Sequence, residues 1–184
     1  MAQAQAMNRH TVVVIINFFA FQLLWVAAVL GGSQGAVVPA WGVLATMLVA
    51  QIALTRQWKQ DIFLITAGGL MCALMEPLWL LPEALQYKSW QQHWWAPPWV
   101  WALWMGFAAS FRYSLSWLCG RPVFAALFGG LGGVFSVMMG IRLGAATAPQ
   151  GWLLLAIIYG ISWAIAVPLL AKIASMTKRE DQHA

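Results

Sequence analysis

Charged residues are scarce in this sequence, and their scarcity is the strongest constraint that it offers. Only 8% of the 184 residues are charged, with ten Lys and Arg and five Asp and Glu, whereas 62% are hydrophobic. A soluble domain carries about 25% charged residues because its surface must be hydrated. The composition therefore excludes an ordinary soluble globule and indicates an integral membrane protein.

Cysteine and histidine are also rare, which removes the common metal-binding motifs. Cys72 and Cys119 lie in or beside apolar stretches and form no CxxC or Cys/His spacing. The three histidines, His10, His93 and His183, lie outside the long apolar stretches, which argues against a haem held by two histidines within a bundle. No HExxH motif or histidine-rich box occurs. We expect no metal and no cofactor, and the sequence leaves open whether the protein is an enzyme.

The excess of basic over acidic residues gives a net charge of +5, which could suggest nucleic-acid binding. The basic residues are scattered between apolar stretches, with no run of five or six and no interleaved aromatic residues. Orientation in a bilayer is a sufficient explanation for their positions. We therefore expect no nucleic-acid partner and expect membrane lipids to surround the chain.

Six apolar runs are long enough to cross a bilayer core of about 30 Å at 1.5 Å per residue. Their approximate limits are Val12–Gly31, Ala36–Thr55, Asp61–Pro82, Pro98–Cys119, Pro122–Leu143 and Gly151–Ala171. Pro77 and Pro168, within the third and sixth runs, predict kinks because each removes a backbone hydrogen bond. The pattern predicts an all-α transmembrane bundle of six helices over residues 12–171, with tails at residues 1–11 and 172–184.

Lysine and arginine are distributed unevenly between the two sides of this bundle. Lys88 and Arg142 fall on one side, Arg112 falls within the fourth run, and the other seven share the side of the termini: Arg9, Arg56, Lys59, Arg121, Lys172, Lys178 and Arg179. Cytoplasmic segments carry the excess of basic residues. The distribution therefore predicts that both termini and both tails are cytoplasmic.

A tryptophan-rich segment joins the third and fourth runs on the opposite side. It extends from Glu83 to Pro97 and contains Trp90, His93, Trp94 and Trp95. Indole rings prefer the headgroup level, where the ring is buried and its N–H stays hydrated. We expect this segment to lie along the outer interface; an aromatic lid over a lipid-facing pocket is the alternative.

Small residues form neighbouring rows on the fifth run. Gly129 and Gly133 are four residues apart, and Gly132, Ser136 and Gly140 form a second row. In lipid, helices associate through close backbone approach, which small residues permit. We expect this helix to be central and to be held between two neighbours. The alternative is a seam between copies of the chain.

Arg112 falls deep inside the fourth predicted span, about seven residues or roughly 10 Å from its cytoplasmic end. A charge at this depth needs a partner, a cavity or a route to the headgroups. One interpretation is that its side chain extends to the headgroups. The other is that it faces inward and forms a site for a phosphate or carboxylate headgroup, together with four polar residues: Asn17, Gln22, Gln51 and Ser116.

Glu76 lies about 22 Å from the cytoplasmic side of the third span. Its depth differs from that of Arg112 by about 12 Å in straight helices, which argues against a direct ion pair. Arg142 lies at a better matching depth. Two hypotheses stay open: a structural pair of Glu76 with Arg142, and a protonatable functional acid.

Four apolar or glycine-rich stretches form a recognisable pattern: Ser114–Leu118, Arg121-Pro122, Ala126–Gly133 and Gly140–Ala145. With Asn17, Gln22 and Trp25 in the first run, they resemble a bacterial inner-membrane family known as domain of unknown function 2878. The resemblance extends from about residue 17 to residue 171. It implies a multi-pass protein of the bacterial inner membrane and no established activity. The resemblance also implies a gene of a kind that is often encoded beside fatty-acyl-modifying enzymes, which is an association and not a physical argument.

The chain departs from the family pattern at two places. Arg112-Tyr113 replaces an Asn-His pair, and Val134-Phe135-Ser136 replaces a segment that often contains Pro-Tyr. If that polar pair is functional in the family, its role is altered or lost here. The family often carries an acid in the third span, and Glu76 occupies the comparable place.

Three hypotheses for function follow. The first is a protein that binds, presents or helps modify a lipid or another amphiphile, with Arg112 at the headgroup. The second is a small oligomeric carrier or flippase that uses Glu76 as a protonatable group. The third is a non-catalytic subunit of a membrane complex, held through the glycine rows. We favour the first because the sequence contains a plausible headgroup site and no recognisable catalytic set.

Overall fold

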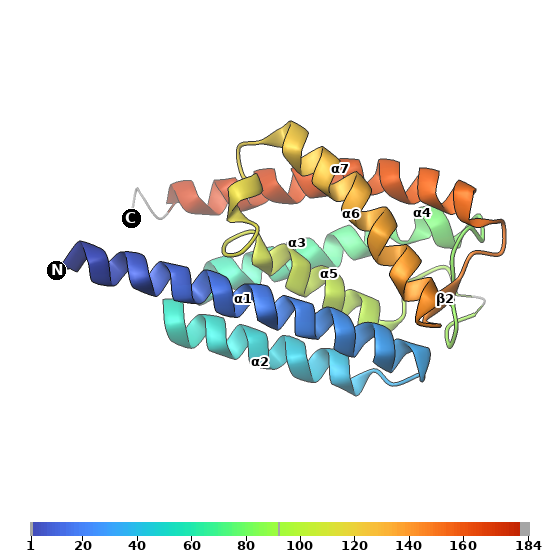
Figure 1. The fold of residues 1–184 in the computed structure, drawn as a ribbon, viewed down its shortest axis with the longest axis horizontal. Helices are drawn as coiled ribbons and strands as arrows, with labels where there is room; N and C mark the ends of the chain where they lie inside the picture. Colours follow the sequence, from blue (N-terminus) through green and yellow to red (C-terminus); the bar gives the residue numbers. More distant parts are fainter. Residues whose placement is uncertain (1, 92, 181–184) are drawn as a thin grey trace.

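The computed structural model describes residues 2–91 and 93–180, and side chains within 10–177 apart from residue 92. The chain forms six helices of 13 residues or more: α1 (Ala2–Ser33), α2 (Val38–Thr55), α3 (Trp58–Met75), α5 (Pro98–Ser110), α6 (Pro122–Arg142) and α7 (Trp152–Glu180) (Figure 1). Five of them, all except α5, are long and apolar enough to cross a membrane. The predicted all-α bundle of six helices is confirmed.

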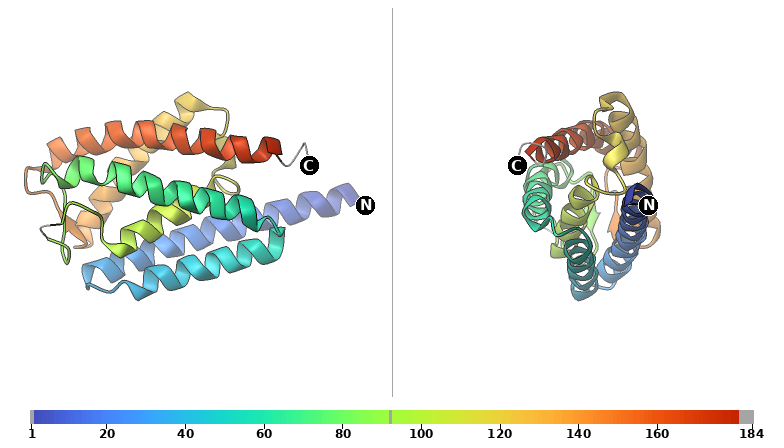
Figure 2. Two further views of the ribbon diagram at one scale, coloured as in Figure 1. Left: turned by 180° about the vertical axis from the view of Figure 1, so that it is seen from behind. Right: turned by 90° about the vertical axis from the view of Figure 1, so that its left-hand side faces the viewer.

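Helix α5 occupies the centre of the bundle, with the longer helices arranged around it (Figure 2). Glycines permit this close packing. A Cβ on Gly68 of α3 would lie 2.5 Å from the backbone oxygen of Trp104, and one on Gly106 of α5 would lie 2.3 Å from Leu24 of α1. The expectation that the glycine-rich fifth span is central was wrong, because α6 packs along α7 at the outside of the bundle.

The fourth predicted span, Pro98–Cys119, was too long. Helix α5 ends at Ser110, and turns and the short helix η1 (Ser116–Leu118) follow before α6 begins at Pro122. At 1.5 Å per residue, 13 residues extend about 20 Å, which is less than the thickness of a bilayer core. Hydropathy alone could not find this end, because the residues after Ser110 are mostly apolar.

The third predicted span is divided next to Pro77, where the sequence predicted a kink. Helix α3 ends at Met75, Glu76 lies at the junction, and the single turn α4 (Pro77–Leu80) follows. Pro77 has no N–H and therefore ends the hydrogen-bond ladder of α3. Pro168, in contrast, lies inside the continuous helix α7.

A two-residue antiparallel ladder closes the end of the bundle that bears α4. Strand β1 (Gln86–Tyr87) pairs with β2 (Ala146–Thr147), and Tyr87 lies opposite Ala146. This ladder ties the tryptophan-rich segment to the connection after α6. The start of α1 and the end of α7 both lie at the opposite end of the bundle (Figure 1).

The helices at the two termini are longer than the sequence indicated. Helix α1 begins at Ala2 and α7 ends at Glu180, so most of both predicted tails continues these helices. Residues 1 and 181–184 of the predicted tails, including His183, lie outside the described residues.

Candidate functional site

A cavity of about 600 Å³ lies between α1, α5, α6 and α7. It lies toward the end that bears the β1–β2 ladder, since Tyr87 and Ala146 are among its lining residues. Its walls are predominantly aromatic and aliphatic side chains and glycine, and Glu76 is the acid among them. The volume and the lining of this cavity are typical of a small-molecule site, because such sites have mainly apolar walls with a few polar groups.

The cavity opens to the side, between α1 and α6. Its lining includes exposed side chains of both helices, among them Gln22 of α1 and Phe128 and Phe135 of α6. Between these helices, Trp25 donates a hydrogen bond from Nε1 to Oγ of Ser136 at 2.9 Å. Both α1 and α6 have the length and composition of a membrane-spanning helix, so the opening lies between two helices that can contact lipid.

The two rows of small residues on α6 have different surroundings. A Cβ on Gly129 would lie 2.3 Å from the backbone oxygen of Trp163, and one on Gly133 would lie 2.6 Å from Cγ of the same residue. A Cβ on Gly132 or Gly140 would meet no atom within 4 Å, and both glycines line the cavity. The first row therefore packs α6 against α7. In the second row, Gly132 and Gly140 form part of the cavity wall, and Ser136 bonds to Trp25 of α1.

Glu76 is buried in the cavity wall and held by three donors from different parts of the chain. Its carboxylate Oε1 accepts a hydrogen bond from Trp104 Nε1 at 2.9 Å. Oε2 accepts one from Tyr87 Oη at 2.8 Å and one from Trp79 Nε1 at 3.0 Å. Burial raises the pKa of Tyr87 well above its ordinary value, so its hydroxyl keeps its proton and donates. These hydrogen bonds fix the carboxylate in position, and Glu76 is only 1% exposed.

Aromatic rings surround this carboxylate and hold one another in place. The ring of Trp104 stacks on Trp163 at 4.5 Å between centroids and 18° between planes. The ring centroids of Tyr159 and Trp79 are 4.5 Å apart. Tyr87 meets Trp99 edge to face at 5.2 Å. Contacts of this kind orient the rings, so the inner end of the cavity has fixed walls.

Arg142 and Glu76 line the same cavity, but the structure does not pair them. In the described part of the chain, the ion pair that forms joins Arg112 and Asp61. Arg142 lies at the C-terminal end of α6 and its side chain is exposed. Among the described residues there is no salt bridge between Glu76 and Arg142, so the hypothesis of a structural pair is not supported. The hypothesis of a functional acid stays a prediction.

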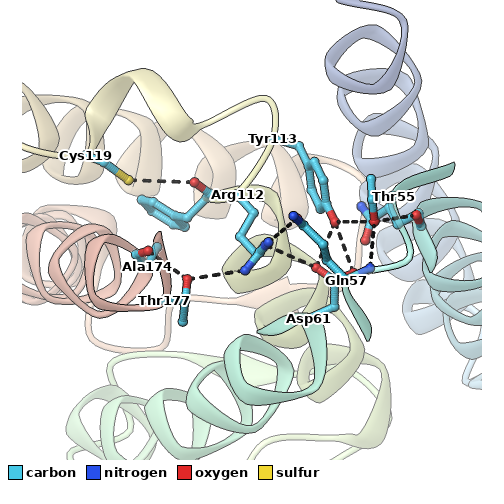
Figure 3. Close-up of polar contacts among 10 residues, drawn as sticks. Thr55, Gln57, Asp61, Arg112, Tyr113, Cys119, Ala174 and Thr177 are labelled. Carbon is cyan, nitrogen blue, oxygen red and sulfur yellow. Dashed lines mark hydrogen bonds and ion pairs between the residues drawn. The ribbon is translucent and has the colours of Figure 1, made fainter. Parts of the chain in front are cut away.

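Arg112 faces the interior near the other end of the bundle (Figure 3). It is 8% exposed and lies in the turn after α5, not on the helix where the sequence placed it. Its Nε lies 3.5 Å from Oδ1 of Asp61, and its two terminal nitrogens donate to Gln57 and Thr177. The side chain of Arg112 therefore faces inward and does not extend to the headgroups. The carboxylate of Asp61 occupies the place beside it where the sequence predicted the phosphate or carboxylate of a headgroup.

Tyr113 completes this cluster. Its hydroxyl donates to Asp61 at 2.8 Å and lies 3.4 Å from the hydroxyl of Thr55 (Figure 3). Burial raises the pKa of Tyr113 to about 12, and the bond to the carboxylate acts in the same direction. The cluster thus joins the connection after α5 to α2, α3 and α7.

The four polar residues predicted to surround Arg112 have different surroundings in the structure. Asn17 is buried, and its Oδ1 accepts hydrogen bonds from the backbone N–H and the hydroxyl of Ser114, at 3.2 and 2.5 Å. Gln51 is buried on α2, Gln22 lines the cavity, and Ser116 begins η1 instead of extending the helix of Arg112. Of the predicted anion-binding set, Gln22 thus lines the cavity, and Asn17 holds the connection after α5 that contains Arg112.

Sequence reasoning missed Asp61 as the partner of Arg112. Only five acids occur in the chain, and Asp61 and Glu76 are the two within the predicted spans. A comparison of the depths of the charged residues in the predicted spans would have favoured Asp61 as the partner of Arg112, because Glu76 lies too far from Arg112 along the bundle. The donors to Glu76 were also missed; a local signal existed only for Trp79, three residues along the chain.

No group of three His, Cys, Asp or Glu side chains that could hold a metal ion occurs among the described residues. The site is therefore defined by the laterally open cavity and by Glu76 in its wall.

These observations define a class: a multi-pass helical membrane protein with an apolar cavity that opens between two of its helices. The sequence profile of the family described as "Protein of unknown function (DUF2878)" matches residues 14–169. The chain belongs to this family. No curated protein and no solved structure that was compared with the chain matches it.

Proposed function

We propose that this protein binds a single-chain or small lipid-like amphiphile in the cavity between α1, α5, α6 and α7. The tail lies against the apolar walls, and the head lies at the inner end beside Glu76. The observation that carries the proposal is a cavity of about 600 Å³ with mostly apolar walls, which reaches exposed side chains of two helices long and apolar enough to cross a membrane. Ligand pockets have volumes of roughly 300–1,000 Å³ and apolar walls with few polar groups.

The opening between α1 and α6 gives a route that avoids water. An amphiphile in the bilayer can enter sideways with its tail in hydrocarbon throughout, so no apolar surface is exposed during entry. Gln22 and the Trp25–Ser136 hydrogen bond supply polar groups at this opening. Such groups at membrane depth are expensive and are typically found where a protein handles a polar ligand.

We place the protein in the bacterial inner membrane, with both termini in the cytoplasm. Two observations support this placement: the excess of basic residues near the end of the bundle where α1 begins and α7 ends, and membership of the family. In this orientation the cavity lies in the outer half of the membrane. The ligand is then drawn from, or delivered to, the outer leaflet.

The test is native mass spectrometry of the protein extracted in a mild neutral detergent. Gly140→Leu places a side chain into the cavity, because a Cβ there meets no atom within 4 Å. Gly42→Leu is the matched control, since Gly42 also has open space but lies on α2 outside the cavity. We expect a co-purifying amphiphile on the wild type and on Gly42→Leu, with occupancy at least about tenfold lower on Gly140→Leu. Equal occupancy of all three would disprove the proposal.

A further inference from the structure

Glu76 differs from the other buried acid, Asp61, in having no basic side chain as a partner among the described residues. Asp61 has the guanidinium of Arg112 beside it. The three groups that contact the carboxylate of Glu76 are two indole N–H groups and one phenol, all neutral. Among the residues that the structure describes, no basic side chain forms an ion pair with Glu76.

Three donors match the ionised form of this side chain. An ionised carboxylate is an acceptor only, whereas a protonated one must also donate. Trp79, Tyr87 and Trp104 all donate, and together they hold both oxygens at the cavity wall. Neutral donors stabilise the carboxylate but leave its full negative charge within the cavity. In an apolar environment such a charge strongly favours a cation as its neighbour.

The rings around Glu76 add a second feature that favours a cation. Trp99, Trp104, Tyr159 and Trp163 line the same cavity as the carboxylate. The face of an aromatic ring is electronegative, and cages of such rings bind ammonium and quaternary ammonium groups. Each cation–π contact contributes about 0.5–2 kcal/mol, the larger values applying to sites without water. An anionic head would meet repulsion from both the rings and the acid.

We propose that the cavity selects an amphiphile whose head carries a positive charge, an amine or a quaternary ammonium group, with Glu76 as its counter-ion. This inference rests on the proposed function and specifies the headgroup. Arg142 lines the cavity at the end of α6, with its side chain exposed. It is long and mobile enough to turn away from a cation, whereas Glu76 is fixed by three hydrogen bonds.

The experiment compares three probes that share a twelve-carbon tail and differ in their heads. Dodecyltrimethylammonium, monododecanoylglycerol and dodecyl sulfate are added to the full-length protein at equal mole fractions in neutral maltoside micelles. Occupancy is read by native mass spectrometry. We expect the ammonium probe to occupy the wild type about tenfold more than the neutral one, and the sulfate probe least. Similar occupancy by the ammonium and neutral probes would overturn the inference.

Two charge variants assign the preference to a residue. Glu76→Gln should reduce the ammonium-to-neutral ratio to near one, whereas Arg142→Gln, which removes a charge from the same cavity, should leave it unchanged or raise it. Loss of the preference in Arg142→Gln alone would also overturn the inference. Tyr87→Phe keeps the charge and removes one hydrogen bond, so it should keep the preference. If Glu76→Gln does not fold, the ammonium-to-neutral occupancy ratios of the wild type and of Arg142→Gln still test whether the cavity selects a cation.

Failure of this inference can be separated from failure of the proposed function. If the neutral probe binds as well as the ammonium probe and Gly140→Leu removes both, the cavity binds amphiphiles without selecting a cation. If Gly140→Leu changes the occupancy of no probe, the cavity is not the binding site, and both proposals fail.

Discussion

Arg112 and Asp61 form a buried ion pair, with 3.5 Å between Nε and Oδ1 and neither side chain more than 5% exposed. Arg112 lies in the connection after α5 and Asp61 lies in the first turn of α3. Gln57, Tyr113 and Thr177 supply further hydrogen bonds to the pair. A hydrogen-bonded pair of this kind allows a short central helix to end inside the bundle, because each charge has its partner within the protein.

Removing one member of this pair should destabilise the fold strongly. Asp61→Asn or Arg112→Met leaves the remaining charge buried without a counter-ion, which costs about 3–5 kcal/mol. The double variant should recover most of this loss, since a buried pair of neutral side chains has no charge to compensate. The measurement is the free energy of unfolding in mixed detergent micelles, with exposed Lys59→Gln as the control. Additive losses in the double variant would show that the pair does not act as a unit.

The two glycine rows of α6 should respond oppositely to alanine. Gly129→Ala and Gly133→Ala place a methyl group 2.3 and 2.6 Å from atoms of Trp163, and overpacking of this kind costs about 1–3 kcal/mol. Gly132→Ala meets open space, and it should stabilise α6 by up to about 1 kcal/mol through helix propensity. Thermal unfolding of the three variants under one condition checks this. A similar loss of thermal stability in all three variants would mean that both glycine rows of α6 pack against neighbouring helices.

Hydropathy predicted most of the helices because long apolar runs have few alternatives in a bilayer. It failed at α5, where the apolar residues after Ser110 continue the run although the chain turns. What ends this helix is the fixing of Arg112 and Ser114 by Asp61 and Asn17, residues of α3 and α1. Contacts between distant segments of this kind leave no periodicity in the sequence.

The candidate site was predicted only in part for the same reason. Glu76 stood out because an acid at membrane depth is costly. Its donors Tyr87 and Trp104 come from β1 and α5, and nothing in the sequence relates them to Glu76. The row of Gly132, Ser136 and Gly140 was recognised as small, but residue size alone does not distinguish a helix contact from a cavity wall.

The hydrogen bond between Trp25 and Ser136 should control exchange at the cavity more than stability. Ser136→Ala removes it, which costs about 0.5–1.5 kcal/mol between the two helices that border the opening. We expect a bound amphiphile to exchange several-fold faster, with an occupancy at equilibrium that changes little. Stopped-flow displacement of a fluorescent amphiphile measures the rate. Ser175→Ala is the control because the Ser175 hydroxyl donates to the backbone oxygen of Ala171 in its own helix; an equal change there would show that the effect is not specific to the opening.

Tyr113 should make the fold sensitive to alkaline pH. Its pKa is raised from an ordinary value of 10.0 to about 12 in the folded protein, mainly by burial. Well below pH 10.0 both folded and unfolded chains hold the proton, so the buried neutral phenol makes its full contribution to stability. Between pH 10.0 and about 12 the unfolded chain releases the proton first, so this stability falls as pH rises. Tyr113→Phe should be less stable at neutral pH but should lose less stability over that interval. Unfolding curves of the two proteins from pH 9 to 12 check this, and parallel losses would place the alkaline sensitivity elsewhere.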